Sequence, residues 1–177
     1  MNVHARLRGF TIVELLIVIV VIGILAAITI VAYNGIQARA RDNIRINDLS
    51  EIAKSLQLYA IDKGPMTNGS GCGSGGNGGG WFSYESPANS YPKSVANCLK
   101  DTGYIQKDIL DPSGSVTCTG LSCRAYILSG CTQGGALSMY IYANLETVGH
   151  ASIDTDATCD PNKDINVGSN YFVKVTY

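Results

Sequence analysis

The sequence predicts an α+β fold, in which a long N-terminal helix packs on a small antiparallel β-sheet. Three observations predict it. A run of 23 residues, Phe10–Ala32, carries a single charge, an amphipathic pattern continues from there to Lys63, and three later segments have the composition of strands. With 177 residues, the chain has room for one domain of ordinary size and an appendage.

The apolar run 10–32 is long enough to cross a membrane as a helix. At about 1.5 Å per residue it covers the roughly 30 Å of a bilayer's hydrocarbon core. A cleaved secretory signal and a plain single-pass anchor are alternatives, although a signal's apolar region usually has about 7 to 15 residues. The one charged residue of the run, Glu14, would cost about 2.5 to 3.5 kcal/mol in a bilayer, so it needs a compensating partner.

The cysteines place the body of the protein in an oxidising compartment. Their even number suits three disulfides, and they all lie in the C-terminal two thirds of the chain, so residues 1–9 are expected to stay in the cytoplasm. Zinc is disfavoured because no CxxC pair occurs and His150 is the only histidine after residue 9. Six cysteines allow fifteen pairings, and the sequence does not decide between them. The pairing that we expect is Cys72–Cys98, Cys118–Cys123 and Cys131–Cys159, chosen only because each pair joins neighbouring segments.

The string GFTIVE at residues 9–14 follows a short basic leader and precedes LLIVIVVIGILAAITI. Over residues 8–33 the chain resembles the class III signal of type IV prepilins. The resemblance implies cleavage after Gly9 by a membrane prepilin peptidase, N-methylation of the new amino terminus at Phe10, and Glu14 as the carboxylate used in assembly. It also implies the pilin fold.

The resemblance divides the chain into four segments. Residues 1–9 are the prepilin leader peptide, and 10–32 form a helix that lies in the membrane and later in the filament core. Residues 33–63 continue this helix with an amphipathic pattern. Residues 64–177 form a globular pilin head with an αβ-loop, an antiparallel sheet and a C-terminal disulfide loop.

The resemblance also supplies a partner for Glu14. Cleavage creates an ammonium on Phe10, and in a staggered helical bundle this ammonium can meet Glu14 of a neighbouring subunit, where low dielectric strengthens the pair. The alternative is a protonated, neutral Glu14 in lipid. Well-studied pilins carry a proline where this chain has Val31, which keeps its N–H and need not kink a helix, so Gly23 remains as a weak point.

Beyond the apolar run, apolar residues recur at steps of three and four, with arginines, aspartates and Lys54 between them. The pattern stops at Lys63, because Gly64 suits a helix end and Pro65 cannot continue the helix. An unbroken helix 10–63 would be about 80 Å long. The apolar positions are Ile36, Ala40, Ile44, Leu49, Ile52, Ala53, Leu56, Tyr59 and Ala60.

The head begins with a glycine-rich segment, 64–80, which is expected to be a surface loop tethered through Cys72. It lacks a phosphate-binding pattern, and its sequon at Asn68 is of a kind that occurs often by chance. A short helix ending near Gly103 follows. The strand candidates are RAYILSG, LSMYIYANLE and NYFVKVTY, which predict a sheet of three or four strands.

The loop DTDATCDPNKD gathers oxygen ligands that could hold calcium, but it lacks the glycine and glutamate of an EF-hand, and a solvated acidic turn is favoured. No other cofactor is expected. An enzyme is not expected either, because a chain cleaved after residue 9 keeps one histidine and no free thiol. The calcium candidates are Asp154, Asp156, Asp160, Asn162 and Asp164.

These features predict a structural subunit of a type IV pilus that polymerises through its N-terminal helix for adhesion, motility or DNA uptake. A minor pilin or type II secretion pseudopilin is the alternative within the superfamily, and a membrane-anchored extracellular binding module is the alternative outside it. The implied partners are further copies of the chain, prepilin peptidase, the pilus assembly platform with its ATPases, and the membrane.

The net charge of −1 gives no basic field for nucleic acid, which would be bound only in DNA uptake. The precursor would sit in the inner membrane with its head outside, and the product would be an extracellular filament.

Overall fold

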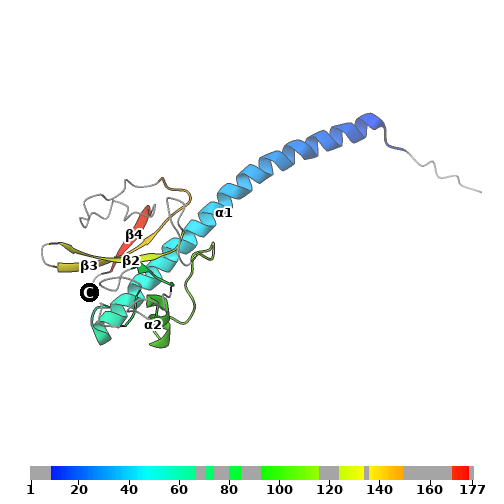
Figure 1. Cartoon of the computed structure of the whole chain (residues 1–177). Helices are drawn as coiled ribbons and strands as arrows, with labels where there is room; N and C mark the ends of the chain where they lie inside the picture. Colours follow the sequence, from blue (N-terminus) through cyan, green and yellow to red (C-terminus); the bar gives the residue numbers. More distant parts are fainter. Residues whose placement is uncertain are drawn as a thin grey trace, which may run out of the picture. The chain divides into compact units, whose positions relative to one another are not determined.

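The computed structural model describes residues 9–66, 71–73, 80–84, 93–115, 124–133, 136–149 and 169–175, without the side chains of residues 31, 131–133 and 136–137 (Figure 1). The chain divides into two compact units, Met1–Ala38 and Arg39–Tyr177. Helix α1, Ile12–Lys63, supplies the described helix of the first unit and the main helix of the second.

The end of α1 is where the sequence predicts it. The helix stops at Lys63, and Gly64 adopts a φ of +84°, a left-handed conformation that favours glycine. The N–H of Gly64 donates to the carbonyl of Ala60 over 3.0 Å, so the last turn is closed before Pro65. The start lies two residues later than expected, at Ile12.

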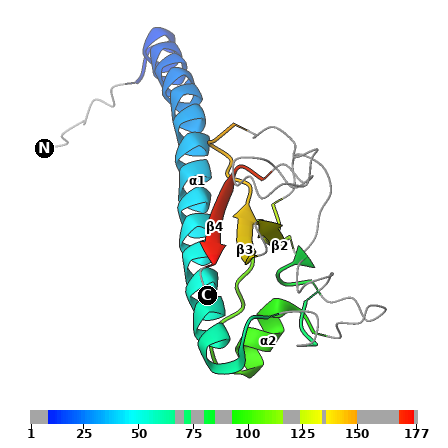
Figure 2. The same cartoon turned by 90° about the vertical axis from the view of Figure 1, so that its left-hand side faces the viewer.

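The second unit contains a four-stranded antiparallel sheet in the order β1-β2-β3-β4 (Figure 2). The strands are β1 (Gly80–Trp81), β2 (Ile127–Gln133), β3 (Ala136–Ala143) and β4 (Tyr171–Val175). Strands β2 and β3 pair from Ile127↔Tyr142 to Gln133↔Ala136. The three longer strands were expected. Strand β1 corrects the expectation of a loop up to Gly80, because Gly80 and Trp81 pair with β2.

The short helix α2, Val95–Asp101, begins and ends with the signals that its sequence carries. Ser94 accepts a hydrogen bond from the N–H of Asn97 over 3.2 Å and caps the N-terminus. At the other end Gly103 has a φ of +82°, and the N–H of Tyr104 donates to the carbonyl of Leu99 over 2.9 Å.

The main core lies between the second half of α1, helix α2 and one face of the sheet (Figures 1 and 2). Alternate strand residues point to it, because side chains of a strand face opposite sides in turn. The other face of the sheet carries a separate aromatic cluster around Tyr140 and Tyr142, with Trp81 and Phe172 packed against it. The sheet and helices contribute mainly Leu49, Ile52, Leu56, Leu99, Leu128, Met139 and Ile141 to the main core.

The first positions of the expected amphipathic stripe are not in the core. Ile36 is 64% exposed and Ile44 is 46% exposed, whereas Leu49 is fully buried. The buried positions before Leu49 are instead the polar residues Asp42, Arg45 and Asp48. This correction has a physical reason, because each of these three finds partners inside the second unit.

Candidate functional site

Thr11 and Glu14 form a capping box at the N-terminus of α1. The backbone N–H and the hydroxyl of Thr11 both donate to Oε2 of Glu14, each over 2.8 Å. In return, the N–H of Glu14 donates to Oγ1 of Thr11 over 3.2 Å. The first turn of a helix leaves its amides without intrahelical acceptors, and this reciprocal pair satisfies two of them. The capping box also explains why the helix begins at Ile12.

The first unit exposes its apolar side chains. Phe10 is 87% exposed, and the large apolar side chains described between Ile12 and Ile30 are 47% to 84% exposed. By length and composition this part of α1 can cross a membrane. A contiguous apolar surface of this size is unfavourable in water, so it requires either lipid or the apolar surfaces of other helices.

The predicted cleavage site, Gly9–Phe10, lies just before the capped helix, and both residues are exposed. A Cβ placed on Gly9 would meet no atom within 4 Å. The fold therefore sets no steric requirement for glycine at this position. Any such requirement must come from a partner that binds the segment.

A second cluster of charges lies in the second unit around Arg45, whose side chain is 1% exposed. We call Arg41, Asp42, Arg45, Asp111 and Glu146 the Arg45 cluster. Nη1 of Arg45 donates to Asp42 over 2.9 Å and to Glu146 over 2.8 Å. Its Nε and Nη2 donate to the two carboxylate oxygens of Asp111, over 2.6 and 3.1 Å.

The cluster fastens α1 to the segment that follows β3. Arg41 donates to both carboxylate oxygens of Glu146, over 2.7 and 2.6 Å. The carboxylate of Asp42 accepts the backbone N–H of Glu146 over 2.8 Å, and also the N–H and hydroxyl of Thr147 over 2.9 and 2.7 Å. Charge-assisted bonds of this kind are stronger than neutral ones.

These contacts change the acidity of the carboxyl groups. Hydrogen bonds from Arg41 lower the pKa of Glu146 to about 2, against a smaller opposing effect of burial and with a further contribution from Arg45. Burial alone would raise the pKa of Asp42, but the hydrogen bonds from Glu146 and Thr147 outweigh it and lower the pKa. Both carboxyl groups are therefore ionised at neutral pH.

Asp48 lies one turn further along α1 and behaves differently. It accepts a hydrogen bond of 2.7 Å from the hydroxyl of Tyr126, and both residues are buried. Burial raises the pKa of Asp48 more than the bond from Tyr126 lowers it. The pKa of the Tyr126 hydroxyl is also raised, first by burial and then by the neighbouring carboxylate. The pair is therefore a structural contact that favours the uncharged forms.

The structure joins Cys72 and Cys98 in a disulfide with a Cα–Cα distance of 6.1 Å, which is the first of the three expected pairings. It links the glycine-rich segment to α2. Cys118, Cys123 and Cys159 lie outside the described residues, as do the calcium candidates between 154 and 164 and the sequon at Asn68. Cys131 lies in β2, but its side chain is not described.

Sequence reasoning missed two of the residues that position these sites. The pattern T-x-x-E at residues 11–14 is a capping signature and could have identified the role of Thr11. Arg45 gave no such signal, because an arginine in an amphipathic helix is ordinarily exposed. The N-terminal motif lies in the first unit and the Arg45 cluster in the second.

A capped and exposed apolar helix, followed by a small disulfide-linked α+β head, defines the prepilin-like class of proteins. Comparison with known proteins agrees. Residues 5–30 match the model of the prokaryotic N-terminal methylation motif. The chain is 31% identical over 119 residues to the type II secretion system core protein G of Escherichia coli K12, covering 65% of this chain and 72% of that protein.

Two further relatives match over about half that length. The type IV wide pilus major component PilA4 of Thermus thermophilus is 39% identical over 61 residues, covering 34% of this chain and 47% of PilA4. The core protein G of Pectobacterium carotovorum is 32% identical over 57 residues, covering 32% of this chain and 36% of that protein. No solved structure matches. The chain belongs to the superfamily of type IV pilins and type II secretion pseudopilins, a structural family.

Proposed function

We propose that the chain is a filament subunit that is cleaved after Gly9, methylated at Phe10 and assembled through the first half of α1. The observation that carries this proposal is the single carboxylate, Glu14, held at the capped N-terminus of an otherwise apolar and exposed helix. The methylation motif at residues 5–30 supports it.

In this mechanism Glu14 has two partners at once. Its hydrogen bonds within the described residues use Oε2, and both come from Thr11. Oε1 can then accept the ammonium that cleavage creates on Phe10 of a neighbouring subunit. In a low-dielectric bundle this pair holds the axial register between subunits, because either charge left alone would be costly.

The proposed route begins in the inner membrane, where residues 1–9 face the cytoplasm and the head lies outside. Prepilin peptidase removes the leader with its two basic residues, Arg6 and Arg8, and leaves 11 basic and 14 acidic residues, so the net charge changes from −1 to −3. The assembly platform and its ATPases then extract the subunit into a filament that serves adhesion, motility or DNA uptake.

A pseudopilin of a type II secretion system is the second candidate. It is favoured by the length of the match to core protein G, 119 residues, compared with 61 for PilA4. A pilin should appear in the sheared surface fraction of the native host, and its deletion should leave protein secretion intact. Deletion of a pseudopilin should instead leave exoproteins in the periplasm.

The mechanism is tested by Glu14→Gln and Glu14→Val in a strain that assembles the protein. Both variants should insert and be cleaved, and both should fail to join filaments. Glu14→Gln is the sharper variant, because glutamine can still complete the capping box and only the charge is lost. Glu51→Gln is the matched control, since it makes the same change in the second half of α1, at a residue whose ion pair with Lys107 over 3.1 Å is exposed.

The measurement is filament yield at matched membrane levels. Wild type and Glu51→Gln should give equal yields, and the two Glu14 variants should give less than a tenth of that yield. Equal yields for all four proteins would refute the pairing mechanism and support the membrane-anchored binding module. Processing is checked separately with Gly9→Ser, which should retain its leader by intact mass.

A further inference from the structure

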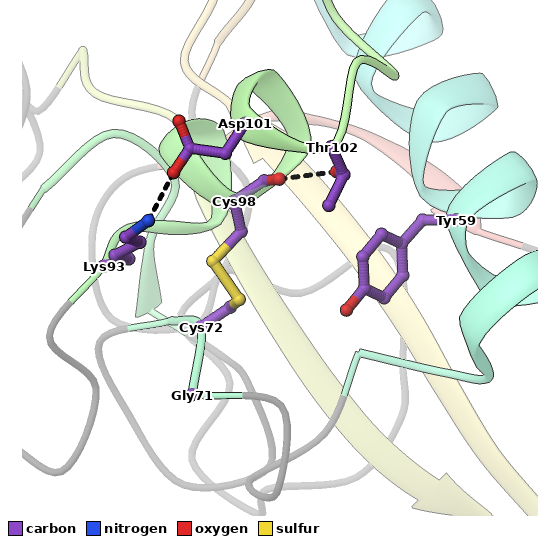
Figure 3. Close-up of a pocket in the computed structure, with 7 residues that line it drawn as sticks. All are labelled: Tyr59, Gly71, Cys72, Lys93, Cys98, Asp101 and Thr102. Atoms are coloured by element: carbon purple, nitrogen blue, oxygen red, sulfur yellow. Dashed lines mark hydrogen bonds and ion pairs between the residues drawn. A yellow bond between two sulfur atoms is a disulfide. The ribbon is translucent and has the colours of Figure 1, made fainter.

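A cavity of about 290 Å³ opens beside the Cys72–Cys98 disulfide in the second unit (Figure 3). It lies between the last turns of α1, the segment 71–73 and helix α2, so three parts of the chain that are distant in sequence form its walls. The lining residues are Tyr59, Gly71, Cys72, Lys93, Cys98, Asp101 and Thr102.

The walls are held in place without a ligand. The disulfide joins two of them, and the N–H of Gly73 donates to the carbonyl of Lys93 over 2.9 Å, beside a β-bridge between Cys72 and Lys93. The hydroxyl of Thr102 donates to the carbonyl of Cys98 over 2.6 Å. A preformed cavity loses little conformational freedom on binding, which favours affinity for a small ligand.

The lining combines one aromatic ring with one neutral pair of charges. The ring of Tyr59 stands on one side and points its hydroxyl toward Gly71 and Cys72 (Figure 3). On the other side of the disulfide, Lys93 and Asp101 form an ion pair whose side chains are 56% and 55% exposed. The disulfide between them adds an apolar, polarisable floor.

We propose that this cavity binds the pyranose ring of a neutral sugar. The apolar C–H face of such a ring suits the ring of Tyr59 and the disulfide, while its hydroxyl groups can donate to Asp101 and accept from Lys93. The charges of this pair cancel, so it offers no net attraction to an anion or a cation. An aliphatic ligand would displace water from Lys93 and Asp101 and could not replace the hydrogen bonds that this water makes to them, so its binding is disfavoured.

The size of the cavity, about 290 Å³, suits a single ring, because it lies just below the range of sites for drug-sized ligands, about 300 to 1,000 Å³. The site belongs to the second unit alone and uses neither Glu14 nor the apolar half of α1. The proposal therefore stands or falls independently of filament assembly.

The test measures binding of the methyl β-glycosides of glucose, galactose, N-acetylglucosamine and N-acetylgalactosamine to the unassembled full chain. The chain is kept in a detergent without a sugar headgroup, and binding is measured by calorimetry or by ligand-observed NMR. At least one glycoside should bind. Asp101→Asn should weaken its binding at least tenfold, because the amide cannot replace the charged acceptor.

Asp108→Asn is the matched control, because Asp108 forms a similar exposed ion pair with Lys100 outside the cavity, over 2.7 Å. It should bind the sugar like wild type. Tyr59→Leu should also weaken binding at least tenfold, provided that its unfolding midpoint matches that of wild type. No binding of any of the four glycosides would overturn the proposal, as would equal binding by Asp101→Asn and wild type.

Discussion

Arg45 and Asp111, which are 66 residues apart in the chain, form a two-point ion pair that is closed to water. Their side chains are 1% and 0% exposed, and two hydrogen bonds of 2.6 and 3.1 Å join them. Asp111 also accepts the N–H of Ser113 over 2.8 Å, so the turn at 111–114 is fixed against α1. A planar guanidinium held at two points fixes direction as well as distance.

Removing Arg45 should therefore destabilise the head strongly. Arg45→Met leaves Asp111 buried without a counter-charge and should lower the free energy of unfolding by about 3 to 5 kcal/mol. Lys107→Ala is the control, because Lys107 and its partner Glu51 are 62% and 41% exposed, and it should cost less than about 1 kcal/mol. Trp81, the only tryptophan, reports unfolding of the second unit in a denaturant titration. Similar losses for the two variants would contradict the importance of burial.

Acid should weaken the head through Glu146. Its folded-state pKa of about 2 lies below the ordinary 4.5, so the stability that it contributes is present above pH 4.5 and is lost as the pH falls towards 2. The expected loss is at most about 3.5 kcal/mol, because the pKa falls by about 2.5 and one pKa unit corresponds to about 1.4 kcal/mol. Denaturant titrations at several pH values measure it, and Glu146→Gln should flatten the profile in that window.

Asp48 should act in the opposite direction. Because burial raises its pKa above the ordinary 3.8, its ionisation on folding is unfavourable at neutral pH. Asp48→Asn keeps an acceptor for the hydroxyl of Tyr126 and should raise the free energy of unfolding at pH 7. The gain should vanish below pH 3.8, where wild-type Asp48 is protonated. A less stable Asp48→Asn protein at pH 7 would show that the charge itself is needed.

Thr11 should control the order of the first helical turn. Thr11→Ala removes the cap and should cost about 1 kcal/mol locally, whereas Thr11→Ser keeps the hydroxyl and should cost little. Hydrogen exchange of the amides of Glu14 and Leu15, which donate to the hydroxyl and the carbonyl of Thr11, measures the effect in detergent micelles. Exchange should be about fivefold faster in the alanine variant, and unchanged exchange would mean that the capping box does not hold the turn.

The disulfide should contribute to the stability of the head. Replacing both Cys72 and Cys98 by alanine should lower the free energy of unfolding by about 2 to 5 kcal/mol, since it releases a segment of 26 residues. Peptide mapping without reduction should recover the Cys72–Cys98 pair, and it also tests the expected pairs Cys118–Cys123 and Cys131–Cys159. Six free thiols in the exported protein would contradict the oxidising compartment.

Sequence patterns predicted the elements that depend on local signals. Gly64 and Pro65 marked the end of α1, and alternation with β-branched and aromatic residues marked the three longer strands. Strand β1 was not predicted, because a strand of two residues is too short to show an alternating pattern. Its existence depends on pairing Gly80 with Leu128, a contact across 48 positions of the chain.

The N-terminal motif could be recognised from local sequence, whereas the Arg45 cluster depends on residues that are distant in the chain. Glu14 is conspicuous in sequence because it is the only charge in an apolar run, and its partner Thr11 is three residues away. Arg45 reads as an exposed residue, because helical periodicity describes neighbours along one helix only. The carboxylates that allow its burial come from Asp111 and Glu146, which only the tertiary fold brings to it.

The strand order has a consequence for how copies of the chain can associate. In the described part of the sheet the two outer strands are β1, with two residues, and β4, with five residues including the exposed Lys174. Short outer strands, and strands that carry a lysine, are poor templates for backbone pairing with another molecule, which is how sheets aggregate into amyloid-like fibres. Heads at high local concentration would thus have little tendency to form β-sheets between molecules. Ordered association of the chains would instead depend on contacts between their helices.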